Sequence, residues 1–162
     1  MWPALRPVRL GFAAGLLLIG VAANAQIRRD SRASKELRLS TSQVTIIVTP
    51  FDFDLATGEA VIPVLHAIRG DGYAYDPWVI RVHSNASFYQ YWVGSTGKPC
   101  NDLEIRASSN FYFRPLAPVD RPVKWGGNTW GFIEFYFDLK LTARLADSAG
   151  EHHITLFFDL QR

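Results

Sequence analysis

The chain has 162 residues, of which 17 are Lys or Arg and 15 are Asp or Glu. Arg6 and Arg9 lie within the first 25 residues, so the remaining 137 residues carry 15 charges of each sign. This balance excludes the basic surface of a nucleic-acid-binding protein, and the length suits one domain with a substantial core.

Residues 1–25 have the pattern of a cleaved signal peptide. Two arginines precede the apolar run Leu10–Ala23, and the small residues of Ala23-Asn24-Ala25 match a cleavage site. The run is shorter than the roughly 20 apolar residues of a membrane-spanning helix. We therefore expect cleavage after Ala25, no transmembrane segment in the mature chain, and a secreted, periplasmic or cell-surface location. A retained N-terminal anchor is the alternative.

Residues 26–40 are expected to form a flexible polar N-terminal segment, because they lack apolar periodicity until Leu37. Basic residues outnumber acidic ones between residues 26 and 38. Contact with an acidic surface or an anionic envelope polymer is the alternative role. The folded domain is predicted to span residues 41–162.

The rest of the chain is rich in β-branched and aromatic residues and is interrupted by turn residues, without a stretch of helical period. Strands are predicted at 42–50, 60–68, 77–85, 87–94, 102–108, 133–145 and 151–160, with 110–116 as a further candidate. Pro63 indicates an edge or a bulge in the second of these. Seven or eight strands at this spacing favour an antiparallel β-sandwich, and a barrel is the alternative.

The turn-like segment 52–59 carries Asp52, Asp54 and Glu59, whose oxygens could bind calcium or act in a hydrolase. The segment departs from the known calcium loop, with apolar residues between the acids. We favour a turn in which Asp54 and Thr57 accept backbone hydrogen bonds and Gly58 adopts a left-handed conformation.

The stretch "VKWGGNTWGF" places Trp125 and Trp130 on either side of a glycine-rich loop. Aromatic planes beside amide groups can form a carbohydrate platform, with Tyr89 and Tyr91 as further candidates; packing at a corner of the sandwich is the alternative. Cys100 is the only cysteine. It has no base or orienting partner nearby in sequence, and we interpret it as a partly buried small side chain or a leftover thiol.

The last two predicted strands alternate strictly. Apolar residues occupy the odd positions of Ile133–Leu145, and the alternation resumes after the turn at Asp147–Gly150, which predicts a long antiparallel hairpin. His152 and His153 then point to opposite faces and cannot share a metal ion. Glu151 shares a face with His153 but a third ligand is missing, so we predict no metal site and no cofactor.

Two stretches, "GDGYAYDPWVIRVHSNASF" and "FDLKLTARLADSAGEHHITLFFDLQ", resemble segments of bacterial exported immunoglobulin-like surface proteins of the WxL or fimbrial type. The resemblance implies a single immunoglobulin-like β-sandwich with an envelope or surface role and transfers no catalytic residue. Trp78-Val79-Ile80 only approximates the W-x-L motif, and the single cysteine excludes the disulfide of many pilus subunits.

We therefore predict a non-enzymatic structural or adhesive component of the bacterial envelope, whose partner is an envelope or surface protein or a polysaccharide. The alternative is a carbohydrate-binding module that uses the loop tryptophans. A hydrolase that uses the acids of segment 52–59 is the third hypothesis.

Overall fold

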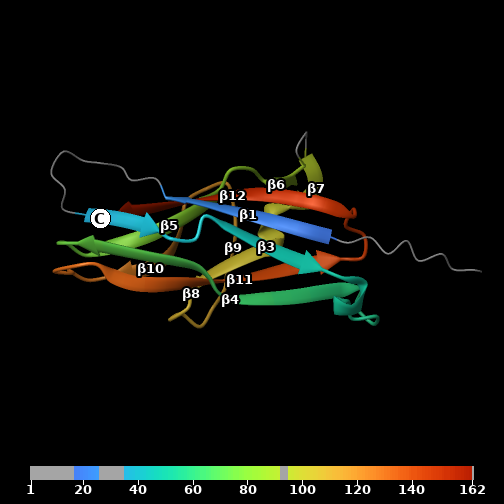
Figure 1. Cartoon of the computed structure of the whole chain (residues 1–162), viewed down its shortest axis with the longest axis horizontal. Coiled ribbons are helices and arrows are strands. Elements are labelled where there is room, and N and C mark those ends of the chain that lie inside the picture. Colours follow the sequence, from blue (N-terminus) through green and yellow to red (C-terminus); the bar gives the residue numbers. More distant parts are fainter. Residues whose placement is uncertain (1–16, 26–34, 92–94, 162) are drawn as a thin grey trace, which may run out of the picture.

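The structure is a computed structural model that describes residues 17–25, 35–91 and 95–161, and these residues form an all-β fold of two facing sheets (Figure 1). We name the sheets A and B. Sheet A contains β1 (Leu17–Ala25), β3 (Gln43–Val48), β5 (Trp78–Ser84), β6 (Phe88–Gln90), β7 (Ser95–Pro99), β10 (Arg121–Gly126) and β12 (Gly150–Gln161). Sheet B contains β2 (Lys35–Leu39), β4 (Glu59–Ala74), β8 (Leu103–Ala107), β9 (Arg114–Pro115) and β11 (Ile133–Arg144). Two 3₁₀ turns, η1 (Pro50–Asp52) and η2 (Cys100–Asp102), complete the described elements.

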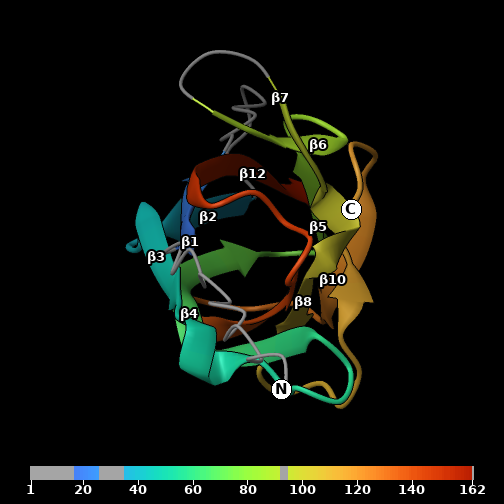
Figure 2. The ribbon, with the colours of Figure 1, turned by 90° about the vertical axis from the view of Figure 1, so that its right-hand side faces the viewer.

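The strands of each sheet have a defined order. Sheet A runs β10-β5-β12-β1-β3, with β6 paired to β12 and β7, and sheet B runs β2-β4-β11-β8-β9. Among the described strands, only β1 and β12 pair in parallel; the other ladders are antiparallel. Viewed end-on, the two sheets enclose a common interior (Figure 2).

The core lies between the sheets and follows the alternation of the sequence. In β11 the inward side chains Phe135, Phe137, Leu139, Leu141 and Ala143 are all buried. In β12 the buried positions are His152, Ile154, Leu156, Phe158 and Leu160, as predicted from their spacing. The ring centroids of Phe137 and Phe158 are 5.2 Å apart, so the two strands meet in the core.

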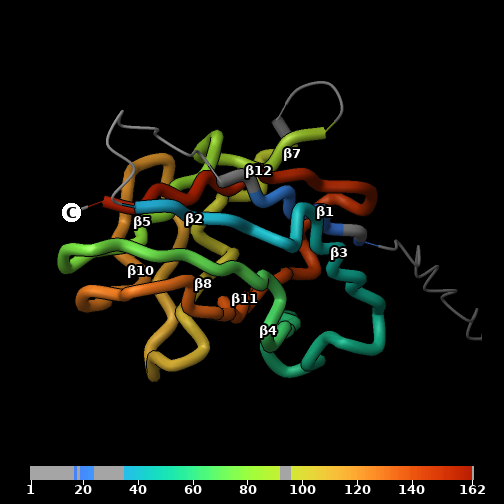
Figure 3. Tube along the Cα trace, turned by 60° about the vertical axis from the view of Figure 1, so that its left-hand side comes forward, coloured from blue at the N-terminus to red at the C-terminus, as the bar shows by residue number. Residues whose placement is uncertain are grey.

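The predicted hairpin between the last two strands is wrong. β11 pairs with β4 and β8 in sheet B, whereas β12 pairs with β1, β5 and β6 in sheet A. The connection between them therefore crosses from one sheet to the other, and the two strands lie in different layers (Figure 3). Alternation requires only that one face of each strand be buried, and two strands facing each other satisfy this as well as two neighbours in one sheet.

The N-terminal part of the described chain contributes two strands. β1 lies within the predicted signal peptide, residues 1–25, and β2 lies in the segment predicted to be flexible. The fold therefore includes residues before 41. Residues 1–16 and 26–34 lie outside the described residues, and cleavage after Ala25 stays a prediction. No helix in the described ranges has the length and apolar character needed to cross a bilayer.

β4 contains a bulge opposite β11 at residues 65–67, whereas Pro63, where an edge or bulge was predicted, pairs in register with Lys140. The register shifts between Phe137 and Leu139, and His66 has a φ of 52°. The His66 N–H donates to the buried Asp138 carboxylate at 2.9 Å. Ser108 and Arg106 donate to the same carboxylate at 2.5 and 2.9 Å. Although burial alone would raise the pKa of Asp138, these donors together hold the pKa below its ordinary value.

Candidate ligand-binding surface

Four aromatic side chains gather at the end of the sandwich where β4 ends and β11 begins. We call Tyr73, Tyr75, Trp130 and Phe132 the aromatic patch. The ring centroids of Tyr73 and Tyr75 are 5.7 Å apart, those of Tyr73 and Phe132 are 4.8 Å apart, and those of Tyr75 and Trp130 are 6.4 Å apart. The contacts link all four rings in one chain.

Local sequence and one loop contact place these rings together. Tyr73 and Tyr75 are two residues apart, at the end of β4 and just beyond it, and therefore project from the same face. Trp130 and Phe132 lie in the connection between β10 and β11. That connection is fixed to β4 by Thr129, whose N–H donates to the Ala74 carbonyl at 2.8 Å and whose Oγ1 accepts from the Ala74 N–H at 2.9 Å.

The aromatic patch faces solvent and borders a cation. Trp130 is 93% exposed, Tyr75 50% and Phe132 44%. The guanidinium carbon of Arg38, on β2, lies 4.2 Å from the centroid of the Phe132 ring. Large apolar side chains are more often buried, so a cluster of exposed rings at one end of the molecule is a candidate binding surface.

The four residues predicted from sequence do not form one surface. Trp130 belongs to the aromatic patch, but Trp125 lies on β10, where its ring is 5.5 Å from the guanidinium carbon of Arg114. Tyr89 is fully buried, and burial is the main cause that raises the pKa of its phenol well above the ordinary value. Tyr91 is hydrogen-bonded through its hydroxyl to Ser148 at 2.6 Å.

Three members of the aromatic patch were not predicted from the sequence. Tyr73 and Tyr75 stand in "GDGYAYD", where the spacing of two was a usable signal for a shared strand face. Phe132 follows Trp130 by two residues in the glycine-containing loop. Their approach to the tyrosines depends on the pairing of β4 with β11, in which Ile133 is opposite Gly72.

The two adjacent histidines lie on opposite faces of β12, as predicted. His152 is fully buried and its Nε2 donates to the Ser148 carbonyl at 2.8 Å. His153 is on the other face with Glu151, whose carboxylate is 3.6 Å from its Nε2. In the part of the chain that the structure describes, no group of three or more His, Cys, Asp or Glu residues is arranged to hold a metal ion.

The segment with the three acids forms the predicted turn. The Asp54 carboxylate accepts from the Ala56 N–H at 2.8 Å, the Thr57 hydroxyl accepts from the Glu59 N–H at 3.3 Å, and Gly58 has a φ of 69°. Asp52 accepts from the N–H and hydroxyl of Thr49, which lowers the pKa of its carboxyl group. The carboxylates of Asp52 and Asp54 thus fix the backbone, whereas the Glu59 carboxylate lies 3.3 Å from Nε of Arg144.

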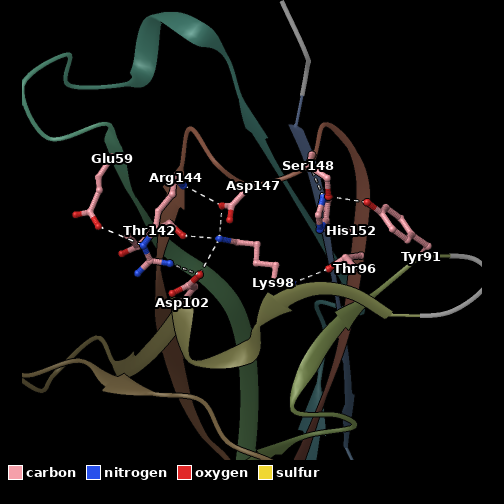
Figure 4. A network of polar contacts seen from close by, with 10 residues as sticks. All are labelled: Glu59, Tyr91, Thr96, Lys98, Asp102, Thr142, Arg144, Asp147, Ser148 and His152. Carbon is pink, nitrogen blue, oxygen red and sulfur yellow. Dashed lines mark hydrogen bonds and ion pairs between the residues drawn. The ribbon is translucent and has the colours of Figure 1, made fainter.

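A buried ionic network lies at the opposite end of β11 (Figure 4). The Lys98 ammonium group donates to Asp102 at 2.9 Å, to Asp147 at 2.6 Å and to the Thr142 carbonyl at 2.8 Å. Arg144 donates to the same oxygen of Asp102 at 2.7 Å. Lys98 is in sheet A and Thr142 in sheet B, so the network joins the two sheets next to the β11–β12 connection.

The ionic network is fully paired and connects the two sheets, as expected for a structural role. All three ammonium hydrogens of Lys98 have acceptors, and the charges of Asp102 and Asp147 are offset by Lys98 and Arg144. Nearby, Cys100 is buried and its thiol donates to the Leu116 carbonyl at 3.6 Å. Of the two interpretations of Cys100, a small side chain or a leftover thiol, its burial in the core agrees with the first.

Comparison with known proteins adds no assignment: no family model matches the chain, and no curated protein matches its sequence.

Proposed function

We propose that the protein is an exported, non-enzymatic, immunoglobulin-like β-sandwich that acts as a structural or adhesive component of the bacterial cell envelope or surface. The observation that carries this proposal is the aromatic patch, a cluster of four rings, three of them exposed, at one end of the two-sheet fold. Of the acids considered for a hydrolase, Asp52 and Asp54 fix a turn and Glu59 pairs with Arg144 at 3.3 Å. The buried ammonium group of Lys98 is fully paired. We therefore assign contact with another molecule to the aromatic patch.

A carbohydrate-binding module is the second candidate, and the arrangement of Tyr75 and Trp130 favours it. Their rings are 6.4 Å apart at an interplanar angle of 55°, and both are open to solvent. Sugar rings present apolar C–H faces that stack on such aromatic planes, and adjacent hydroxyls accept hydrogen bonds from cations. Arg38, at the edge of the aromatic patch, supplies such donors.

Binding of isolated envelope polysaccharide by the purified protein tests both proposals. The wild-type protein should be retained on immobilised polysaccharide and should show a change in tryptophan fluorescence. The double variant Tyr75→Ala/Trp130→Ala should bind at least about tenfold more weakly, because each stacked ring contributes on the order of 1 kcal/mol.

The matched control is Phe111→Ala/Tyr112→Ala. These two rings are also in edge-to-face contact, with centroids 5.5 Å apart, and are 85% and 80% exposed. This variant should bind like the wild type. Equal weakening by both double variants would show nonspecific adsorption through exposed rings and would contradict the assignment. Unchanged binding by Tyr75→Ala/Trp130→Ala would remove the aromatic patch from the proposal.

A further inference from the structure

The aromatic patch continues into charged side chains on the outward face of sheet B. In β4, Gly70 and Gly72 face the core, where an added Cβ atom would lie 2.7 and 3.5 Å from the ring of Phe135. Asp71 and Tyr73 therefore project to the outward face, because successive side chains of a strand point to opposite sides. Two residues of a strand span roughly 7 Å, so the Asp71 carboxylate lies beside the rings.

Each arginine beside Asp71 is paired with a different acid. Nε of Arg38 lies 2.7 Å from the Glu36 carboxylate. Nη2 of Arg69 lies 2.5 Å from the Glu134 carboxylate. In the register of the sheet, Asp71 is opposite Arg38 on β2 and opposite Glu134 on β11. Within the part of the chain that the structure describes, the Asp71 carboxylate makes no hydrogen bond or ion pair. The charges of the two pairs cancel, so the charge of Asp71 remains.

One ring of the aromatic patch already holds a cation of the chain itself. The guanidinium carbon of Arg38 lies 4.2 Å from the centroid of the Phe132 ring. Among the described residues, no cation contacts the rings of Tyr75 and Trp130. Their centroids are 6.4 Å apart and both rings are exposed, so an incoming cation can approach both within the roughly 6 Å range of a cation–π contact.

The charges around the rings set the sign of the ligand. The outward groups beside the aromatic patch are two arginines and three acids, which leaves one negative charge: Arg38, Arg69, Glu36, Asp71 and Glu134. An anionic polymer or an anionic bilayer is repelled by this excess, whereas a cation is attracted. Aromatic rings stack on the apolar C–H face of a sugar and also attract ammonium groups. A sugar that carries an ammonium group satisfies both preferences.

We propose that the polysaccharide bound by the aromatic patch consists of amino sugars whose amino groups are free and protonated. One ammonium group contacts the rings of Tyr75 and Trp130, and a neighbouring one in the same polymer is attracted by Asp71. Tyr75 lies four residues after Asp71, which corresponds to roughly 13 Å along an extended chain, so the ligand is an oligosaccharide rather than a single sugar. The inference rests on polysaccharide binding in the proposed function and adds the charge of the ligand.

A pair of oligosaccharides tests the charge without any change to the protein. Glucosamine tetramer and N-acetylglucosamine tetramer share one backbone, and acetylation of each amine removes its positive charge. In isothermal titration calorimetry at mildly acidic pH, the wild-type protein should bind the glucosamine tetramer at least about tenfold more tightly. Equal or tighter binding of the N-acetylated tetramer would overturn the inference but leave sugar binding by the aromatic patch in place. Binding of neither tetramer would also overturn the inference, and the proposed function would be judged by isolated envelope polysaccharide.

A salt series on the wild-type protein measures the electrostatic part of binding. Affinity for the glucosamine tetramer should fall as the salt concentration rises, because ions screen the attraction between exposed charges. Affinity for the N-acetylated tetramer should stay constant. A preference for the glucosamine tetramer that does not depend on salt would contradict recognition of its charge.

The variant Asp71→Asn removes the uncompensated charge. It should bind the glucosamine tetramer about threefold or more weakly than the wild type, and binding of the N-acetylated tetramer should not change. The matched control is Asp120→Asn, which removes an exposed carboxylate paired with His83 at 2.8 Å. Asp120 precedes β10, whereas Trp130 follows this strand. Equal weakening by both variants would show an effect of net charge alone and would contradict the role of Asp71, as would unchanged binding by Asp71→Asn.

The variant Arg38→Gln separates a cationic ligand from a neutral one. It removes the chain's own cation from the Phe132 ring and leaves Glu36 without its partner. The glucosamine tetramer should therefore bind about threefold or more tightly to this variant. A neutral sugar that accepts hydrogen bonds from Arg38 would instead lose affinity. Weaker or unchanged binding of the glucosamine tetramer would overturn the inference.

The variant Tyr75→Ala/Trp130→Ala locates the cation site. It should bind both tetramers weakly, with a preference for the glucosamine tetramer of less than about threefold. A full preference in this variant would place the cation site elsewhere and would overturn the inference. Circular dichroism should show the wild-type β-sheet spectrum for every variant. If a variant does not fold, the two tetramers and the salt series on the wild-type protein decide.

Discussion

At the scale of single residues, His152 makes stability depend on pH. Burial is the main cause that lowers the pKa of His152, and Lys98 and His153 act in the same direction. The carbonyl of Ser148 and the charge of Asp147 oppose the shift without cancelling it. The imidazole is therefore neutral in the folded protein at pH values where an exposed histidine already binds a proton.

The sign of the resulting effect follows from linkage. Below the ordinary histidine pKa of about 6.5, the unfolded chain takes up a proton at residue 152 that the folded chain resists. The contribution of His152 to the free energy of unfolding should therefore be complete above pH 6.5. It should fall as the pH drops below this value, by up to about 1.4 kcal/mol per pH unit for this one group.

Urea unfolding at pH 7.5 and pH 5.5 measures this dependence. A His152→Leu variant should lose less stability than the wild type between the two pH values, whatever its stability at pH 7.5. His83→Leu, which removes a half-exposed histidine paired with Asp120 at 2.8 Å, is the control and should retain the wild-type decrease. A decrease of equal size in His152→Leu and wild type would contradict the assigned role.

At the scale of elements, the alternation of β11 sets which substitutions matter. Phe137 is fully buried between the sheets and contacts the rings of Phe135 and Phe158. Phe137→Ala should lower the free energy of unfolding by about 3–5 kcal/mol, because it leaves a cavity in the core. Lys140 lies on the other face and pairs with Glu104 at 2.8 Å, so Lys140→Ala should cost less than about 1 kcal/mol.

Chemical denaturation of the two variants separates these values. Similar losses at both positions would mean that β11 does not present one face to the core and the other to solvent. Loss of folded protein in Phe137→Ala alone, seen as absence of a cooperative transition, agrees with the larger expected cost.

Alternation in the sequence predicted the buried faces of β11 and β12 but not the neighbours of these strands. Burial of one face depends on each strand separately. Pairing depends on contacts between distant segments, which is why β11 and β12 were assigned to one hairpin. β2 and β10 were not predicted because "KELRL" and "RPVKWG" carry charges or a proline within a short strand.

Only part of the candidate site was predicted, because it too depends on contacts between distant segments. Trp130 stands out in its glycine-rich loop, and exposure of such a ring can be inferred locally. Tyr89 and Tyr91 have similar sequence surroundings, yet one is in the core and the other is bonded to Ser148. Which aromatic residues meet at one end of the sandwich is decided by the pairing of β4 with β11 and by the contact of Thr129 with Ala74.

At the scale of the whole molecule, the two ends of the sandwich differ in chemistry. One end presents the aromatic patch to solvent. At the other end, the buried ionic network of Lys98 connects the sheets beside the β11–β12 connection. Removing one partner of such a network leaves uncompensated buried charge, so this end is built to hold the sheets together. One end thus carries the contacts between the sheets, and the other carries the exposed rings of the aromatic patch.

The central claim is that the exported protein associates with the envelope through the aromatic patch. Fractionation of cells that express the full chain tests it most directly, with wild type, Tyr75→Ala/Trp130→Ala and the control Phe111→Ala/Tyr112→Ala compared at equal expression. Wild type and control should sediment with the envelope, and the patch variant should shift to the released fraction while keeping its β-sheet circular dichroism spectrum. A folded patch variant that sediments as fully as the wild type would contradict the account, as would wild-type protein that is not exported.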